Sequence, residues 1–261
     1  MDGIFLRPIA HIHTDYAQKF GIPRQSGLVS EAQGVIVFEP EFAKNKAVMG
    51  LDEFTHLWLI WHFQNGREGG GANDVMADAQ NAQTSCSSLS AEELLEEAQN
   101  RTWSATVRPP RLGGSERKGV FATRSPFRPN PLGLSCVKID YVETTSDGPL
   151  IHVLGADLRD GTPIFDIKPY LPLADCHPEA SGGFTERLDN TLLTVEIAPD
   201  LLELVPAEKQ DALIQVLEND PRPVGVDDPT REYTLAYAGF EVHFTIANLI
   251  ATVTAVGPLQ A

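Results

Sequence analysis

A stretch of nineteen residues with three prolines, Arg117–Ser135 (RKGVFATRSPFRPNPLGLS), restricts the fold more than any other part of the chain. Each proline fixes its own φ, removes a backbone hydrogen-bond donor and biases the preceding residue towards extended geometry. This stretch therefore cannot form a helix. We expect a short strand at Gly119–Ala122, a stiff turn at Thr123–Pro131 and a second strand at Leu132–Ile139.

Four basic residues lie in the same stretch, and the turn fixes the direction of two of them, Arg124 and Arg128. A guanidinium held in one direction suits the binding of a carboxylate or a phosphate. A rigid surface turn with solvated arginines explains the composition equally well. The stretch alone leaves both interpretations open.

The chain of 261 residues carries a formal net charge of −16, which argues against nonspecific binding to nucleic acid or to anionic membranes. The charge is unevenly distributed. Residues 101–128 hold seven basic residues and one acidic residue, so this window carries +6 and the rest of the chain −22. A basic window within an acidic protein predicts a local anion-binding site.

The length suits one large domain, or a main domain with a smaller appendage. No apolar run approaches the ~18 residues of a membrane-spanning helix, and the N-terminal residues lack the layout of a secretory signal. We therefore predict a soluble, cytoplasmic protein without a membrane segment. Cys86, Cys136 and Cys176 are odd in number and far apart, which argues against both a disulfide framework and a cysteine-rich zinc site.

Short strands joined by turns rich in glycine and proline follow one another through residues 1–170. The most apolar run, Phe54–Phe63, has the aromatic and β-favouring content of a buried strand. This pattern predicts a mainly β protein, either a β-barrel or a sandwich.

Residues from about 67 to 100 differ from this pattern and are interpreted as an insertion. Ser90 and Glu93 form a capping box, which predicts a short helix over Ser90–Gln99. The glycines of Gly66–Gly71 follow an apolar strand, as in a dinucleotide-binding loop. Their spacing is not GxGxxG and no suitable helix opens directly from them, so a flexible insertion is the favoured interpretation.

The C-terminal part combines strands with an apolar stripe at helical spacing over Pro199–Asn219. It predicts a small α+β lobe. We place the boundary near Asp175–Gly183, which gives a main domain of residues 1–180 and a lobe of residues 181–261.

Two clusters of polar residues invite functional interpretations. His11, His13 and Asp15 have side chains that suit a divalent metal, but regular strand–helix alternation does not follow them, so a solvated loop is favoured. In LGADLRDGTPIFDIKPY, the turn Arg159–Thr162 can offer backbone N–H groups to an anion, with carboxylates nearby. An ordinary type I turn is the favoured interpretation of that stretch by itself.

Several stretches taken together are similar to one family. FATRSPFRPNPLGLS, the preceding RPPRLGG, DGTPIFDIKPYLP, the KFGIPRQSGL loop, FTHLWLI and the late DPRP resemble the TsaA/TrmO family of tRNA methyltransferases, in order from about Ile4 to Ile246. The first two blocks are long and unusual, which makes the resemblance specific.

The resemblance implies a β-barrel enzyme, rather than a doubly wound methyltransferase, that uses S-adenosyl-L-methionine and carries a small tRNA-contacting C-terminal lobe. It implies methylation of N6 of threonylcarbamoyladenosine beside the anticodon of threonine tRNA. It further implies a homodimer, with the methyl donor bound near the subunit interface.

The resemblance also assigns residues by position. Arg128, Asp220 and Arg222 are expected to contact tRNA or to order the site. Gln64 stands where bacterial members have histidine, and compact members lack the insertion. The expected donor-binding residues are Pro23, Arg24, Gln25, Phe63, Gln64, Arg124, Leu134, Leu158, Asp160, Gly161 and Thr162.

Methyl transfer to nitrogen is an in-line displacement at a sulfonium carbon, which needs no metal and no covalent intermediate. Because the attacking N6 must lose a proton, we expect Asp166 or Asp160 as the base, with Tyr170 and Lys168 as orienting groups. Alignment of donor and acceptor alone supplies much of the acceleration, so a dedicated base is not required.

Other functions fit parts of the sequence. The acidic surface suits a methyltransferase of the same fold that acts on another nucleoside or on a small molecule. A noncatalytic module that binds S-adenosylmethionine or a nucleotide as a sensor is a second alternative. A metal-dependent hydrolase that uses His11 and His13 is a more distant third.

Overall fold

The computed structural model describes residues 5–63, 103–109, 116–188, 190–222 and 228–259. The chain divides into two compact units. The first contains residues 1–62, 134–222 and 227–261, and the second contains residues 63–133 and 223–226. The predicted domains, residues 1–180 and 181–261, stay a prediction.

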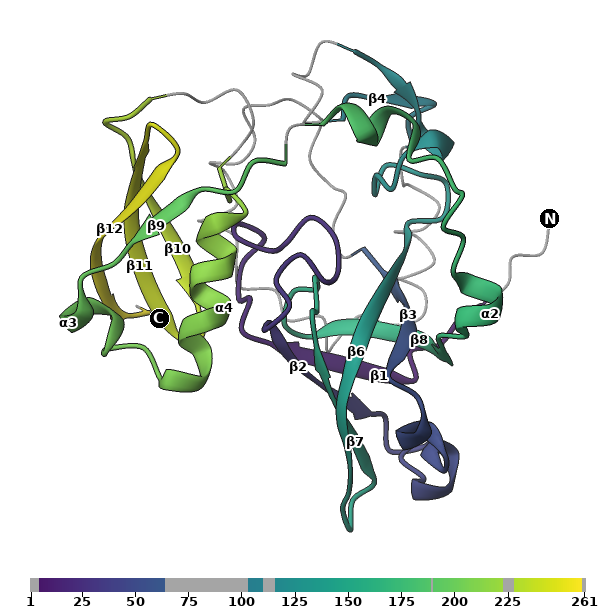
Figure 1. The fold of residues 1–261 in the computed structure, drawn as a ribbon. Coiled ribbons are helices and arrows are strands. Elements are labelled where there is room, and N and C mark those ends of the chain that lie inside the picture. Colours follow the sequence, from purple (N-terminus) through teal and green to yellow (C-terminus); the bar gives the residue numbers. More distant parts are fainter. Residues whose placement is uncertain (1–4, 64–102, 110–115, 189, 223–227, 260–261) are drawn as a thin grey trace. The chain divides into compact units, whose positions relative to one another are not determined.

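Six strands close into a barrel in the order β1-β2-β7-β6-β3-β8 (Figure 1). The pairs β1–β2, β2–β7, β6–β7, β3–β8 and β1–β8 are antiparallel. The mainly β fold with a barrel, which the sequence predicts, is confirmed. The strands are β1 (Ala10–Thr14), β2 (Gln33–Phe38), β3 (His56–His62), β6 (Leu132–Thr144), β7 (Pro149–Leu154) and β8 (Thr162–Pro169).

Alternate side chains of these strands fill the interior of the barrel, because successive residues of a strand point to opposite faces. The predicted buried strand at Phe54–Phe63 is confirmed as β3, whose Leu57 and Leu59 point inward. Trp61 also points inward, and its indole N–H donates to the buried hydroxyl of Ser135 at 3.0 Å. The fully buried aliphatic residues are Ile12, Ile36, Leu57, Leu59, Ile151 and Ile164.

The C-terminal residues form a four-stranded sheet in the order β10-β11-β12-β9, with β9 parallel to β12. The apolar face of α4 packs against this sheet, where Leu213 and Leu217 share a core with Phe244. The apolar stripe at helical spacing over Pro199–Asn219 corresponds to two helices, α3 and α4. The elements are β9 (Thr194–Glu196), α3 (Pro199–Leu202), α4 (Ala207–Glu218), β10 (Glu232–Tyr237), β11 (Phe240–Ala247) and β12 (Ile250–Pro258).

The two helices separate at Pro206, which is the N-cap of α4. A proline has no backbone N–H to donate and clashes with the preceding turn, so it starts a helix more readily than it continues one.

Short helical turns complete the first unit. They are η1 (Asn45–Val48) and η2 (Leu51–Glu53) between β2 and β3, then α2 (Pro172–Asp175) and η7 (Gly183–Arg187) after β8. Among the described residues, no helix has the length and apolarity that crossing a membrane requires.

The described part of the second unit contains β4 (Thr106–Val107), β5 (Lys118–Gly119) and η6 (Val120–Ala122). The strand predicted at Gly119–Ala122 is therefore wrong for Val120–Ala122, which form a turn of 3₁₀ helix. The helix predicted over Ser90–Gln99 and the glycines of Gly66–Gly71 lie outside the described residues.

Candidate functional site

Antiparallel pairing brings two loops with predicted site residues to one end of the barrel. The first loop runs from the end of β1 to the start of β2 and contains residues 23–25. The second runs from the end of β7 to the start of β8 and contains residues 158–162. The loops touch where the Gly27 N–H donates to the Gly155 carbonyl at 2.9 Å.

The start of β6 lies at the same end of the barrel. The backbone N–H of Cys136 donates to the Ser26 hydroxyl at 3.1 Å, which ties β6 to the first loop. Leu134 is two residues earlier on β6, and its side chain is 50% exposed. The structure thus gathers Leu134 and the two loops at one end of the barrel, as the donor-site prediction requires.

The turn Arg159–Thr162 departs from the expected type I geometry. Gly161 has φ +76° at the third position of the turn, which is the conformation of a type II turn and favours glycine. The Thr162 N–H closes the turn by donating to the Arg159 carbonyl at 3.2 Å. Among the described residues, no atom lies within 4 Å of a Cβ placed on Gly161.

The alternative interpretation, in which this turn offers backbone N–H groups to an anion, is wrong for residues 160–162. The Asp160 N–H donates to the Tyr16 carbonyl and the Gly161 N–H to the Ile12 carbonyl, each at 2.9 Å. With Thr162 closing the turn, all three donors are used within the protein. The turn is therefore a support for its side chains rather than an anion-binding loop.

The Asp160 carboxylate is the exposed acidic group of this turn. Its Oδ1 accepts the Thr14 N–H at 3.1 Å and lies 3.1 Å from Nδ1 of His13. Its side chain is 48% exposed. Within the described part of the chain, Oδ2 makes no hydrogen bond, so this oxygen is available to a ligand hydroxyl or amine.

Other predicted donor-site residues face inward. The side chains of Leu158 and Thr162 are 1% and 4% exposed, and Pro23 is also buried. The Leu158 carbonyl accepts the Thr14 hydroxyl at 2.9 Å. These three residues shape the loops, whereas Arg24 and Gln25 present exposed side chains.

The structure joins Arg24 to the predicted tRNA-contacting residues, although Arg24 and Arg222 are 198 positions apart. A guanidinium nitrogen of Arg24 donates to the Arg222 carbonyl at 3.2 Å. Arg222 in turn forms a bidentate pair with Asp220, with both N–O distances 2.9 Å. The Arg222 carbonyl thus contacts Arg24, while its guanidinium is held by Asp220.

The candidate catalytic residues lie further along β8. Asp166 forms an ion pair with Lys168 at 2.9 Å, and both face away from the barrel interior opposite Ile60 and Trp58 of β3. Asp160 and Asp166 are six positions apart, which corresponds to at most ~20 Å along extended chain. The two carboxylates have different partners, since Asp160 pairs with His13 and Asp166 with Lys168.

Tyr170 follows β8 and belongs to an aromatic cluster. Its ring centroid is 5.9 Å from that of Trp58 and 6.2 Å from that of His56. Desolvation and the nearby Cys176 and Asp175 raise the pKa of the Tyr170 phenol. The phenol therefore stays protonated at neutral pH, which makes it a hydrogen-bond donor rather than a proton acceptor.

Asp175 holds Trp58 of this aromatic cluster in place. Its Oδ2 accepts the Leu171 backbone N–H at 2.8 Å and the Trp58 indole N–H at 3.0 Å. These two hydrogen bonds, the backbone one above all, hold the pKa of the Asp175 carboxyl below its ordinary value.

The second unit contains Phe63, Arg124 and Arg128, while Gln64 lies outside the described residues. The Phe63 N–H donates to the Pro131 carbonyl at 3.0 Å, and the Arg124 side chain is exposed. Arg128 turns back into its own loop and donates to the carbonyls of Ser125, Val120 and Thr123. Arg128 thus braces the proline turn, and its contact with tRNA stays a prediction.

The residues considered for a metal have separate partners. His11 lies 2.8 Å from Glu39, His13 pairs with Asp160, and Asp15 accepts the Lys209 ammonium at 2.7 Å. Within the described ranges, no three His, Cys, Asp or Glu side chains are placed to hold one metal ion.

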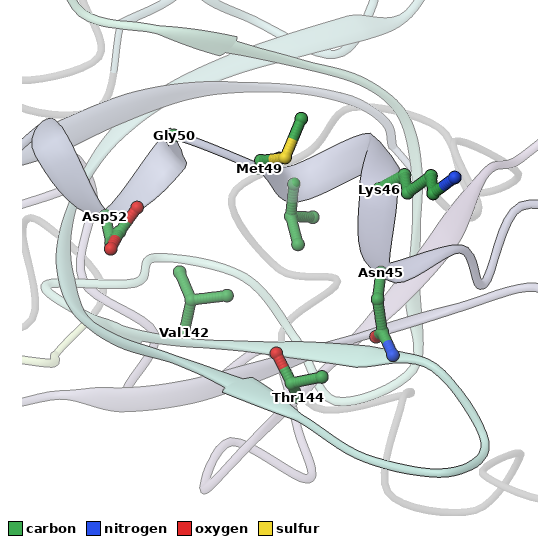
Figure 2. Close-up of a pocket in the computed structure, with 8 residues that line it drawn as sticks. Asn45, Lys46, Met49, Gly50, Asp52, Val142 and Thr144 are labelled. Carbon is green, nitrogen blue, oxygen red and sulfur yellow. The ribbon is translucent and has the colours of Figure 1, made fainter.

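A shallow pocket of about 340 Å³ lies at the opposite end of the barrel (Figure 2). The helical turns η1 and η2 and the C-terminal half of β6 line it, with Met49, Asp52, Val142 and Thr144 among its residues. No predicted site residue lines it, so we do not place the site there.

Sequence reasoning missed the residues that hold the two loops, namely Thr14, Asp15 and Lys209. Lys209 is 194 positions from Asp15, and no local pattern signals such a pair. The only signal for Thr14 and Asp15 was their place at the end of a strand, next to the two histidines.

The comparisons with known proteins cover both parts of the chain. Residues 11–176 match a family model described as the tRNA-methyltransferase O N-terminal domain, and residues 190–259 match the TrmO C-terminal domain. The Escherichia coli tRNA (adenine(37)-N6)-methyltransferase is 35% identical, with 93% of this chain and 97% of that protein covered. An Eikenella corrodens protein of the same name is 45% identical over 59% of this chain and 87% of its own length.

A solved structure supports the same relationship. The crystal structure of TrmO from Pseudomonas aeruginosa matches with a TM-score of 0.69 and 25% identity. The match covers 98% of this chain and 99% of that one.

The Asp175 hydrogen bonds predict a defined pH dependence of stability. Since the folded-state pKa of this carboxyl is lowered, its stabilisation is present above the unfolded-state pKa of ~3.9 and is lost as the pH falls through the folded-state value. We expect Asp175→Asn to lower the free energy of unfolding at pH 7, and the difference from wild type to narrow below about pH 4. Urea unfolding across this pH range measures it.

The exposed Asp147→Asn is the matched control, with an expected change at pH 7 below ~0.5 kcal/mol. A difference between wild type and Asp175→Asn that stays constant or grows towards acid pH would contradict the assigned role of the carboxylate.

Proposed function

This chain belongs to the tRNA-methyltransferase O family, and from that premise we propose that it transfers a methyl group from S-adenosyl-L-methionine to N6 of the adenosine at position 37 of tRNA. The main support for this proposal is the length over which the chain matches its relatives. Relatives named for this activity align with both the barrel and the C-terminal sheet, so the proposal does not depend on one shared motif.

The finer assignment rests on the resemblance of the motifs. We propose that the methylated base is threonylcarbamoyladenosine of threonine tRNA, that the enzyme works in the cytoplasm and that it forms a homodimer. The basic residues of the 101–128 window favour a polyanionic substrate, because they are concentrated in one stretch of an otherwise acidic chain.

The chemistry of the exposed groups at the barrel end suits S-adenosylmethionine. The Asp160 carboxylate, with Oδ2 directed to no other described group, suits the ribose hydroxyls. The Arg24 guanidinium suits the methionine carboxylate. Leu134, which is half exposed, offers an apolar wall to the adenine, and the open space beside Gly161 lets a ligand approach the backbone.

The bound donor supplies an activated methyl group, and the chain's own residues align it with the acceptor nitrogen. We assign the two loops to donor binding and alignment. Tyr170, whose phenol stays protonated, is proposed as a hydrogen-bond donor that orients the substrate. The Asp166–Lys168 pair or Asp160 is proposed to receive the N6 proton, directly or through water.

The purified chain provides the direct test of this function. Incubated with S-adenosylmethionine and with threonine tRNA that carries threonylcarbamoyladenosine at position 37, it is expected to yield a nucleoside that is heavier by one methyl group. Nuclease digestion followed by mass spectrometry measures this product. The same tRNA with unmodified adenosine at that position is the control and is expected to remain unmethylated.

Methylation of the unmodified control at an equal rate would contradict the finer substrate assignment. No methylation of either tRNA, by protein that binds the methyl donor, would contradict the activity itself.

The proposed donor site predicts an effect of Asp160→Asn. The amide still accepts the Thr14 N–H, so the turn is retained, but the charge that strengthens a hydrogen bond to ribose is lost. We expect the Kd of S-adenosylmethionine to rise by roughly tenfold, from about 1.5 kcal/mol of lost charge-assisted bonding. Isothermal titration calorimetry measures it, with Asp147→Asn as the control of equal charge change. Unchanged affinity in Asp160→Asn would remove Asp160 from the site.

A further inference from the structure

The segment Thr14–Ala17 is bonded on one side to the turn that carries Asp160. The Thr14 hydroxyl donates to the Leu158 carbonyl at 2.9 Å, and the Tyr16 carbonyl accepts the Asp160 N–H at 2.9 Å. The Ala17 carbonyl accepts Nε of Arg159 at 3.1 Å. The position of the turn therefore depends on the position of this segment.

The same segment is bonded on its other side to the C-terminal residues. The Asp15 carbonyl accepts the Ala238 N–H at 3.0 Å, and its carboxylate accepts the Lys209 ammonium at 2.7 Å. Lys209 also donates to the Gln33 side-chain carbonyl at 2.8 Å. In Figure 1, α4, which carries Lys209, lies between the C-terminal sheet and the loop after β1.

The ion pair between Lys209 and Asp15 is largely shielded from solvent. Its side chains are only 21% exposed for Lys209 and 16% exposed for Asp15, so solvent and salt screen it less than a surface pair. Tyr16 and Tyr237 pack beside it with ring centroids 5.7 Å apart, and both are 1% exposed.

Both phenols stay neutral, because burial raises the pKa of each well above its ordinary value. Among the described residues, neither phenol oxygen has a hydrogen-bond partner. The two phenols carry no charge, and the charge of the Asp15 carboxylate is balanced by the ammonium of Lys209.

From these contacts we propose that Lys209 is a positioning residue for the methyl-donor site. Lys209 holds Asp15, Asp15 fixes the segment Thr14–Ala17, and this segment holds the Arg159–Thr162 turn so that Asp160 faces the donor. The inference rests on the proposed function in one respect, the assignment of Asp160 to donor binding. It adds that a residue of the C-terminal lobe sets the affinity of the barrel for its donor.

Lys209→Met tests the inference, because methionine keeps much of the aliphatic stem and removes the charge. We expect the Kd and the KM for S-adenosylmethionine to rise by roughly five- to tenfold, with kcat changed less than about twofold, since coupling at the lower end of this scale is typical between linked sites. Lys209→Arg, which retains the cation, is expected to keep most of the affinity. Lys44→Met, an exposed lysine near η1, is the matched control with wild-type affinity.

Hydrogen exchange of the Asp160 amide gives a readout that does not depend on catalysis. This amide donates to the Tyr16 carbonyl, so its protection is expected to fall in Lys209→Met and to be retained in Lys44→Met. Should Lys209→Met not fold, Asp15→Asn provides the same test, with a change in the same direction.

A lower melting temperature of Lys209→Met with wild-type donor affinity and wild-type Asp160 protection would overturn the inference, since the pair would then serve stability alone. The two proposals fail in different ways. Wild-type protein that binds no S-adenosylmethionine would contradict the proposed function, while the exchange of the Asp160 amide would still decide whether Lys209 positions the turn.

Discussion

β8 is hydrogen-bonded to both β3 and β1, and this second pairing closes the sheet into a barrel without a free edge. Antiparallel pairing determines which loops share an end, because neighbouring strands run in opposite directions. The loops after β1 and after β7 leave at the same end, and they contain Arg24 and Asp160, which lie far apart in the sequence. Buried aliphatic side chains, among them Ile12, Leu59 and Ile164, fill the interior of the barrel, and we therefore propose that the site lies outside it.

The loops after β1 and after β7 are held by hydrogen bonds with the barrel and with C-terminal residues such as Lys209 and Arg222. All three N–H groups of residues 160–162 are used internally, and glycine at position 161 permits the turn its positive φ. The backbone that carries the Asp160 carboxylate is therefore held in place, because each N–H group of residues 160–162 already has an acceptor. Binding groups held in this way lose little entropy when a ligand arrives.

The sequence predicted those parts of the structure that local patterns determine. The apolar, aromatic and β-favouring content of Phe54–Phe63 identified β3, and Pro126, Pro129 and Pro131 excluded a helix in the turn that contains them. The motifs of the family indicated the barrel, the cofactor and the candidate residues. Inward orientation of Leu158 and Thr162 was not predicted, because the face that a loop residue presents depends on contacts with distant strands.

Contacts between distant residues account for the other differences. Arg128 looked like a group directed at an anion, yet it bonds to carbonyls of its own loop. Asp15 and Lys209 are 194 positions apart, and neither residue type nor spacing relates them. The alternative of an anion-binding turn fails for a similar reason, since the carbonyls that accept the Asp160 and Gly161 N–H groups come from the loop after β1 and from β1.

We propose that the methyl donor binds outside the barrel interior, at the end where the loops after β1 and β7 meet. A crystal structure of the protein with S-adenosylhomocysteine, the demethylated donor, tests this placement. We expect the ribose hydroxyls within hydrogen-bonding distance of Asp160 and the ligand carboxylate near Arg24. A ligand bound at the opposite end, in the pocket beside Met49 and Val142, would contradict the claim.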